Sequence, residues 1–200
     1  MIFHFAEGAL KPPAPALPHA PSMAERQVVS HLLPLDSQPD AAIEALLDSA
    51  FGPDRHGRTA YRIRAGMPWL PALSFAMTDD IDGLVGTLQS WPVALTDAAG
   101  RQVPLIMVGP VAVAPAHQKG GHGRALMDAV VDTARNLGTE PLMMIGDPEY
   151  YGRFWGFSAA ETGGWDAPGP FERHRLLALS VDGRAVGGQG MLAPRIAVVA

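Results

Sequence analysis

A glycine-rich, basic loop suited to holding a phosphate group lies between Val111 and Arg124, in the sequence VAVAPAHQKGGHGR. The stretch before it, 104–113, is almost wholly apolar, and 123–137 carries apolar side chains at helical spacing. We therefore expect a strand, a loop and a helix in that order. Glycine lets a ligand approach the backbone closely, and the first turn of a helix presents unpaired N–H groups at the positive end of its dipole. The pattern predicts an anion site, most naturally for phosphate.

Two common phosphate-binding motifs fit this loop poorly. A nucleotide P-loop needs Gly-Lys-Ser/Thr at the helix start, whereas Gly123 is followed by Arg124 and Ala125. A dinucleotide fingerprint needs a third glycine where this chain has Leu126. What remains is Q-x-x-G-x-G after a Val-Ala-Val strand, which resembles motif A of the GCN5-related N-acetyltransferases. The alternative is a helix N-terminus with incidental glycines.

In that family the backbone amides of the loop hold the pyrophosphate of coenzyme A. Gly109-Pro110 interrupts the central strand, and because proline cannot donate to a ladder, the strand needs a bulge or an unpaired side and can bend away from its neighbour. The resemblance implies that the freed backbone pairs with the pantetheine arm; a kinked core strand without a ligand is the alternative. The expected coenzyme A contacts are Val111, Ala112, Val113, Gln118, Lys119, Gly120, Gly121, His122, Gly123 and Arg124.

A second segment, 147–157, is similar to the D-P-x-Y-Y-x-R-F-G-F sequence of a bacterial branch of these acetyltransferases, called YhbS-like. Trp155 is an extra residue, so the register between the tyrosines and the Gly-Phe turn shifts by one. The resemblance makes Tyr151 the expected acid for the departing thiolate, with Tyr150 second, because a phenol of pKa near 10 stays protonated at rest. The alternative is a tyrosine that only packs in the aromatic cluster.

Other polar residues have weaker claims to a role. His117 could serve as a base, although a surface position is the expectation, and Asp147 is expected to cap the helix that follows it. The spacing of His31, His56 and His174 suggests no metal site, so no metal is expected.

Composition limits the class of protein. With 200 residues, 48% of them hydrophobic, the chain can form one domain with a core. A net charge of −5 does not favour binding to nucleic acid or to an anionic membrane, because both are negatively charged. Cysteine is absent, and no apolar run reaches the roughly 18–20 residues that cross a bilayer. We expect a cytoplasmic enzyme, with dimers common in the family it resembles.

The chain divides into two parts. We expect residues 1–26 to form a Pro/Ala-rich extension, in which Met23 is a possible start, and the resemblance implies one N-acetyltransferase domain over 27–200. A first helix should be capped by Asp36 or Ser37, with Pro39 in its first turn. Further strands are expected at 28–33, 73–77, 84–90, 141–146, 157–160, 174–181 and 196–199, and further helices at 58–64 and 148–154.

This order predicts the α/β class with a mixed sheet. The resemblance implies the GNAT fold, in which a central, mostly antiparallel sheet is splayed at its middle strands and flanked by helices. The implied function is transfer of an acetyl group from acetyl-CoA to a primary amine of a small molecule or peptide, by direct attack. The alternatives are a non-catalytic coenzyme A or acyl-CoA sensor and an acyltransferase that uses a longer acyl chain.

Overall fold

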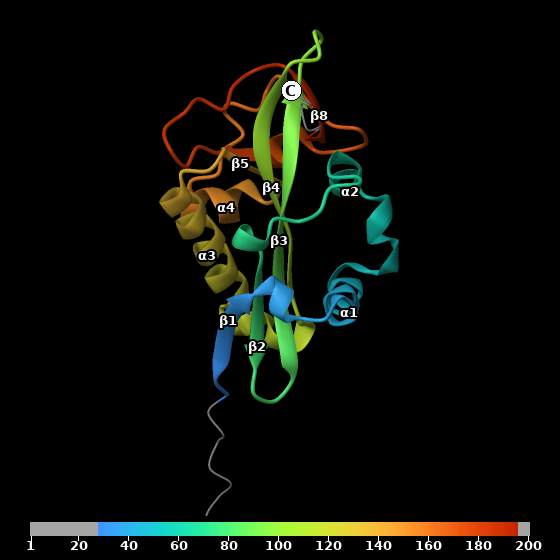
Figure 1. The fold of residues 1–200 in the computed structure, drawn as a ribbon, viewed down its shortest axis with the longest axis vertical. Helices are drawn as coiled ribbons and strands as arrows, with labels where there is room; N and C mark the ends of the chain where they lie inside the picture. The colour runs from blue at the N-terminus through green and yellow to red at the C-terminus, as the bar shows by residue number, and fades with distance from the viewer. Residues whose placement is uncertain (1–27, 196–200) are drawn as a thin grey trace, which may run out of the picture.

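Eight strands form one sheet in which most neighbours are antiparallel (Figure 1). The computed structural model describes residues 28–195. The strand order is β1-β2-β3-β4-β5-β7, with β8 beside β3 and β6 beside β8. Among these residues, only the β4–β5 and β6–β8 pairs are parallel, so the predicted mixed sheet is confirmed. The strands are β1 (Ser30–Pro34), β2 (Phe75–Asp79), β3 (Gly83–Thr96), β4 (Gln102–Val113), β5 (Leu142–Ile145), β6 (Trp165–Asp166), β7 (Leu176–Leu179) and β8 (Gly190–Pro194).

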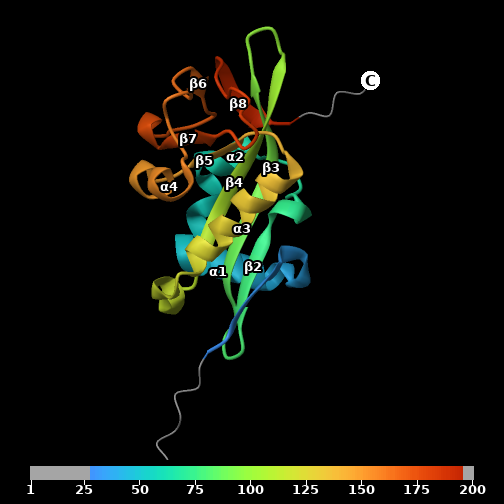
Figure 2. The same ribbon diagram turned by 90° about the vertical axis from the view of Figure 1, so that its left-hand side faces the viewer.

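Helices cover both faces of the sheet, as Figures 1 and 2 show. One face carries α3 (His122–Leu137) and α4 (Pro148–Trp155), and the other carries α1 (Asp40–Phe51) and α2 (Thr59–Ile63). The predicted apolar stripe of α3 is buried except for Leu137 at its end, which is 60% exposed, and each of its larger buried side chains contributes about 1.5–3 kcal/mol. The 3₁₀ turns are η1 (Leu35–Ser37), η2 (Pro53–Gly57), η3 (Pro71–Leu73), η4 (Pro115–Gly120) and η5 (Arg173–Arg175).

The predicted bulge in the central strand is present. Ser90 of β3 pairs with Val108 and Leu88 pairs with Val111, so Gly109 and Pro110 together oppose a single residue of β3. The φ angle of Gly109 is +126°, which a residue with a side chain rarely adopts.

The bulge reverses which face each later side chain of β4 occupies. Before it, Ile106 and Val108 belong to the core under α3; after it, Val111 packs on that core and Ala112 packs under α1. Because side chains alternate along a strand, one extra residue produces this reversal.

The same bulge marks the place where the two middle strands part. β4 and β5 pair at only two positions, Ile106 with Leu142 and Met107 with Met143. Beyond Met107, β4 continues to Val113 along β3 while β5 runs on beside β7. The predicted splay is therefore confirmed.

The first helix begins later than the sequence suggested. Its N-cap is Pro39, with no side-chain hydrogen bond, and Asp36 and Ser37 lie in η1 instead. The cause is Leu35, which is fully buried and fixes η1 against the core. The prediction that Asp36 or Ser37 caps α1 was wrong.

The later part of the sheet also differs. Residues 157–160 make only an isolated bridge, Ser158 with Ala178, because the Ser158 hydroxyl accepts from the N–H of Ala160 and turns the chain. In the glycine-rich end, β8 pairs with β3 where a loop was expected.

Two predictions lie outside the described residues: the 1–26 extension and the strand at 196–199. Within 28–195, no helix has both the length and the apolar character needed to cross a bilayer.

Candidate active site

A cavity of about 940 Å³ opens where β4 and β5 part. One wall is β4 from Met107 to Val111, and the opposite wall is the end of β5 with the start of α4. The segment 51–64 and the segment 170–175 close its sides. A strand edge without a partner strand presents free N–H and C=O groups, so this cavity can bind an extended ligand by backbone pairing.

The bulge is held open by a buried arginine. The carbonyl of Gly109 accepts hydrogen bonds from Arg64 Nη1 at 2.7 Å and from Trp91 Nε1 at 2.8 Å. The Arg64 guanidinium carbon lies 4.1 Å from the ring centre of Tyr61 and 4.2 Å from that of Trp91. Burial lowers the pKa of Arg64 to about 10, so it stays charged at neutral pH. Sequence analysis missed this residue, since nothing local in the chain links it to Gly109.

Replacing Arg64 by alanine should therefore lower the free energy of unfolding by about 2–4 kcal/mol, because a large buried side chain and its hydrogen bond are lost. Urea unfolding measures the change. The matched control is Arg62→Ala on the same helix, since Arg62 is exposed and donates only to the Pro168 carbonyl at 3.2 Å; it should change stability by less than about 0.5 kcal/mol. Equal losses in the two variants would contradict the role of Arg64.

The predicted phosphate loop lies at the far end of β4, beyond the cavity. Gly121 is the N-cap of α3 with φ of +75°, and no side chain caps the helix. The N–H groups of Arg124 and Ala125 bond to the Gly121 carbonyl, whereas a helix leaves the N–H groups of its first two residues, His122 and Gly123, without intrahelical partners. These amides fit an anion, which the helix dipole also favours.

Of the other expected coenzyme A contacts, some lie at the cavity or the loop and others do not. Val111 lines the cavity, and Val113 packs beside Gly123 at the base of the loop, which makes the strand end and the loop continuous. Ala112 instead packs under α1. Arg124 is exposed and its guanidinium lies 4.6 Å from the ring centre of Phe154, so it bridges α3 to α4.

Both tyrosines lie at the start of α4 and line the cavity. Asp147 caps this helix, as predicted, by accepting from Glu149 N–H at 2.9 Å and Tyr150 N–H at 3.5 Å. Tyr151 packs its ring over Gly146, where a Cβ would come within 2.7 Å of the ring carbons. A side chain at this end of β5 would thus displace Tyr151.

The two rings differ in environment. Tyr150 is 39% exposed and meets Tyr151 edge to face, with ring centres 5.1 Å apart. Burial, and then the neighbouring Tyr150 and Asp147, raise the pKa of Tyr151. Tyr151 therefore remains protonated at neutral pH.

Trp155 ties the end of α4 to α3. It is buried as the last residue of α4, and its Nε1 donates to Asp128 Oδ1 of α3 at 2.8 Å. The Asp147 cap sets the start of the helix, where both tyrosines lie, and Trp155 sets the packing of its end.

The surface position expected for His117 was wrong. Its side chain is only 19% exposed, and its Nε2 lies 3.1 Å from one carboxylate oxygen each of Asp79 and Asp82.

The splayed central strands and the uncapped N-terminus of α3 are the features that sequence analysis expected of an acyl-CoA-using transferase. Residues 41–157 match the acetyltransferase (GNAT) family, which is more than half of the chain, and the chain belongs to that family. The predicted family and the predicted enzyme class, an acetyltransferase, are thereby confirmed.

Individual relatives agree with this assignment. The chain is 27% identical over 128 residues to the uncharacterized N-acetyltransferase YhbS of Escherichia coli strain K12, covering 64% of this chain and 71% of that protein. Its fold is similar to the crystal structure of Escherichia coli YhbS in complex with CoA, with a TM-score of 0.63 and 23% identity, over 84% of this chain and 89% of that one. It is also similar to a GNAT family acetyltransferase from Brucella melitensis in complex with acetyl-CoA, with a TM-score of 0.56 and 24% identity, over 84% and 96%. The chain is thus similar to YhbS in sequence and in fold.

Proposed function

We propose that this protein transfers the acetyl group of acetyl-CoA to a primary amine of a small molecule or peptide. The observation that carries the proposal is the cavity at the splay, which has the free edge of β4 on one wall and Tyr151 on the other. Two proteins of similar fold were crystallised with CoA or acetyl-CoA, which supports the same co-substrate here.

Coenzyme A would lie along the edge of β4 that is left free where β5 parts from it. Its pyrophosphate would lie on the amides of 118–124 and its pantetheine arm beside 111–113. Lys119 and Arg124 are exposed next to these amides and add positive charge. A ligand in this orientation directs its thioester toward the cavity, because the cavity lies beside Met107–Val111, on the side of 111–113 away from the loop.

The reaction proceeds by direct attack. A neutral amine attacks the thioester carbonyl, whose developing oxyanion accepts from a backbone N–H near Val111 or Val113. The C–S bond then breaks, and the thiolate takes the proton of the Tyr151 hydroxyl. The nitrogen loses its extra proton to water, and the tyrosinate recovers a proton from water. This chemistry needs no metal.

The side of the cavity formed by 51–64 and 170–175, where the amine would enter, carries charged groups of both signs among apolar side chains. Arg55 is neutralised by Glu44 and Asp48, to which it donates, whereas Glu172 and Arg175 at the rim are exposed. An open space beside Tyr151, with charged side chains at its rim, favours a catalyst over the alternative, a sensor that only binds coenzyme A.

The direct test measures thiol release from acetyl-CoA in the presence of a panel of primary amines. Because the protein has no cysteine, a thiol reagent reports only coenzyme A. We expect release that depends on the amine, with the acetylated amine identified by mass. Saturable binding of acetyl-CoA with no release for any amine would overturn the proposal in favour of the sensor.

Arg124→Ala should weaken coenzyme A binding by about 1–2 kcal/mol, roughly 5- to 30-fold, if its guanidinium contacts phosphate. Isothermal titration calorimetry measures the affinity. Arg135→Ala, an exposed arginine in the last turn of the same helix, is the matched control and should bind normally. Unchanged affinity in Arg124→Ala would leave Arg124 only its contact with Phe154.

A further inference from the structure

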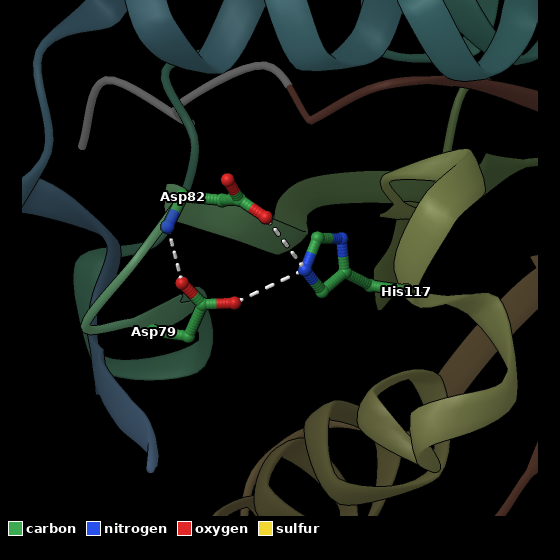
Figure 3. Close-up of side chains that lie close together, drawn as sticks. All are labelled: Asp79, Asp82 and His117. Atoms are coloured by element: carbon green, nitrogen blue, oxygen red, sulfur yellow. Dashed lines mark hydrogen bonds and ion pairs between the residues drawn. The ribbon is translucent and has the colours of Figure 1, made fainter. Parts of the chain in front are cut away.

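Three side chains of types that can bind a metal come together at the end of β2 (Figure 3). Asp79 ends β2, Asp82 lies in the turn that follows, and His117 lies in η4. We propose that these three residues bind one divalent transition-metal ion, with Zn²⁺ the ion that the ligands suit best. Sequence analysis expected no metal from the spacing of His31, His56 and His174, and it did not consider His117 as a ligand, which is far from the two carboxylates along the chain.

The spacing of the three donor atoms fits a small ion. His117 Nε2 lies 3.1 Å from Asp79 Oδ2 and 3.1 Å from Asp82 Oδ2, and all three atoms are within 4.8 Å of one another. Zinc bonds of about 2.1 Å place two ligand atoms about 3.0 Å apart at a right angle and about 3.4 Å apart at the tetrahedral angle. The third separation, between the two carboxylate oxygens, is at most 4.8 Å, so these oxygens would approach by up to about 1.4 Å to reach the tetrahedral spacing.

A buried oxygen without a hydrogen bond points into this cluster. The side chain of Asp79 is 0% exposed. Its Oδ1 accepts from the N–H groups of Ile81 at 2.9 Å and Asp82 at 2.5 Å, which fixes the carboxylate. Its Oδ2 lies 3.1 Å from His117 Nε2, an ion-pair distance that Figure 3 marks, but it accepts no hydrogen bond among the described residues. An enclosed carboxylate oxygen without a donor is costly, and a cation removes that cost.

The charges and the ligand types favour a transition metal. With a neutral imidazole the cluster carries two negative charges, which a divalent ion balances. Imidazole nitrogen with carboxylate oxygen suits Zn²⁺, whereas Mg²⁺ and Ca²⁺ prefer oxygen alone. Asp82, with its side chain 57% exposed, leaves an open side where water can complete the coordination.

The position indicates a structural role. His117 directly precedes the loop at 118–123, and Asp79 and Asp82 flank the β2–β3 turn, so an ion would tie the entry of the loop to the sheet. The cavity with the tyrosines lies farther along β4. The proposal therefore concerns folding of the loop region and does not depend on the acetyl-transfer proposal.

The test uses the untagged full chain, treated with a chelator and then dialysed. Titration calorimetry with ZnCl₂ should show one saturable site that is lost, or weakened more than about tenfold, in Asp82→Asn and in His117→Gln. The exposed position of Asp82 makes Asp82→Asn safe for folding. Zn²⁺ should raise the melting temperature of the parent protein but not of the two variants. Co²⁺ in place of Zn²⁺ should give visible absorption bands that disappear in His117→Gln.

The matched control is His31→Gln. His31 lies 3.3 Å from Asp80 of the same turn, is half exposed, and stands outside the proposed ligand set. It should bind Zn²⁺ as the parent does. The proposal is overturned if the parent shows no saturable binding, if both ligand variants keep the parent affinity, or if His31→Gln weakens binding equally. The cluster would then be an imidazolium ion held between two carboxylates.

Discussion

Replacing Tyr151 by phenylalanine should lower kcat about 10²–10³-fold at neutral pH and leave acetyl-CoA affinity nearly unchanged. The variant removes only the hydroxyl, so the ring can still pack over Gly146 and the α4 start is preserved. A proton donor acts on the departing thiolate in the transition state, and its loss therefore appears in kcat. Steady-state kinetics with the amine found by the thiol-release assay, together with calorimetry for acetyl-CoA, separate the two effects.

The pH dependence of kcat gives this prediction a second readout. Burial raises the pKa of Tyr151 above its ordinary value near 10, and an acid must be protonated to act. We therefore expect kcat to stay unaffected by the ionisation of Tyr151 from neutral pH up to about pH 10. Above that, kcat should fall as the pH rises through the raised pKa of Tyr151. The alkaline fall should be absent in Tyr151→Phe, within the pH range where that variant stays folded.

Tyr150→Phe is the matched control, since the two rings are adjacent and both line the cavity. It should retain most of the parent kcat. A large loss of kcat in Tyr150→Phe with none in Tyr151→Phe would assign the role of acid to Tyr150. If neither change affects kcat, water or another group protonates the sulfur and the proposed mechanism is wrong.

The strand, loop and helix around the phosphate loop could be predicted because their determinants are local. The apolar spacing of 123–137 fixes the buried face of α3, and Gly138 ends it in the left-handed conformation. The Gly109-Pro110 pair can hardly continue a regular ladder, so the bulge and the splay also follow from neighbouring residues.

The features that sequence analysis missed depend on partners far along the chain. Arg64 is buried because it bonds to the carbonyl of Gly109, and His117 is enclosed by the carboxylates of the β2–β3 turn. β8 forms in a glycine-rich segment because β3 extends beyond β2 and offers an unpaired edge to it. No periodicity within a single segment carries this information, since tertiary contacts override local preference.

The second large effect is expected at the start of α3, where Gly123→Val should abolish coenzyme A binding in a folded protein. A Cβ at Gly123 would meet Val113 Cγ2 at 3.6 Å, an ordinary contact, and valine is a better helix former than glycine. The protein itself should accept the side chain, which would instead fill the space in front of the amides that the pyrophosphate needs. Calorimetry should show an affinity loss of at least about 100-fold, nearly 3 kcal/mol.

A pair of alanine substitutions separates an effect on coenzyme A binding from a loss of stability. Gly121→Ala and Gly138→Ala each place a side chain at positive φ, +75° and +61°, with open space around the new Cβ. Both should cost about 1–2 kcal/mol of stability, because both force the left-handed conformation on alanine. Only Gly121→Ala should also weaken coenzyme A, since Gly138 lies at the other end of the helix. Unchanged coenzyme A affinity in folded Gly123→Val, or equal affinity losses in the two alanine variants, would refute the assignment of the pyrophosphate to this loop.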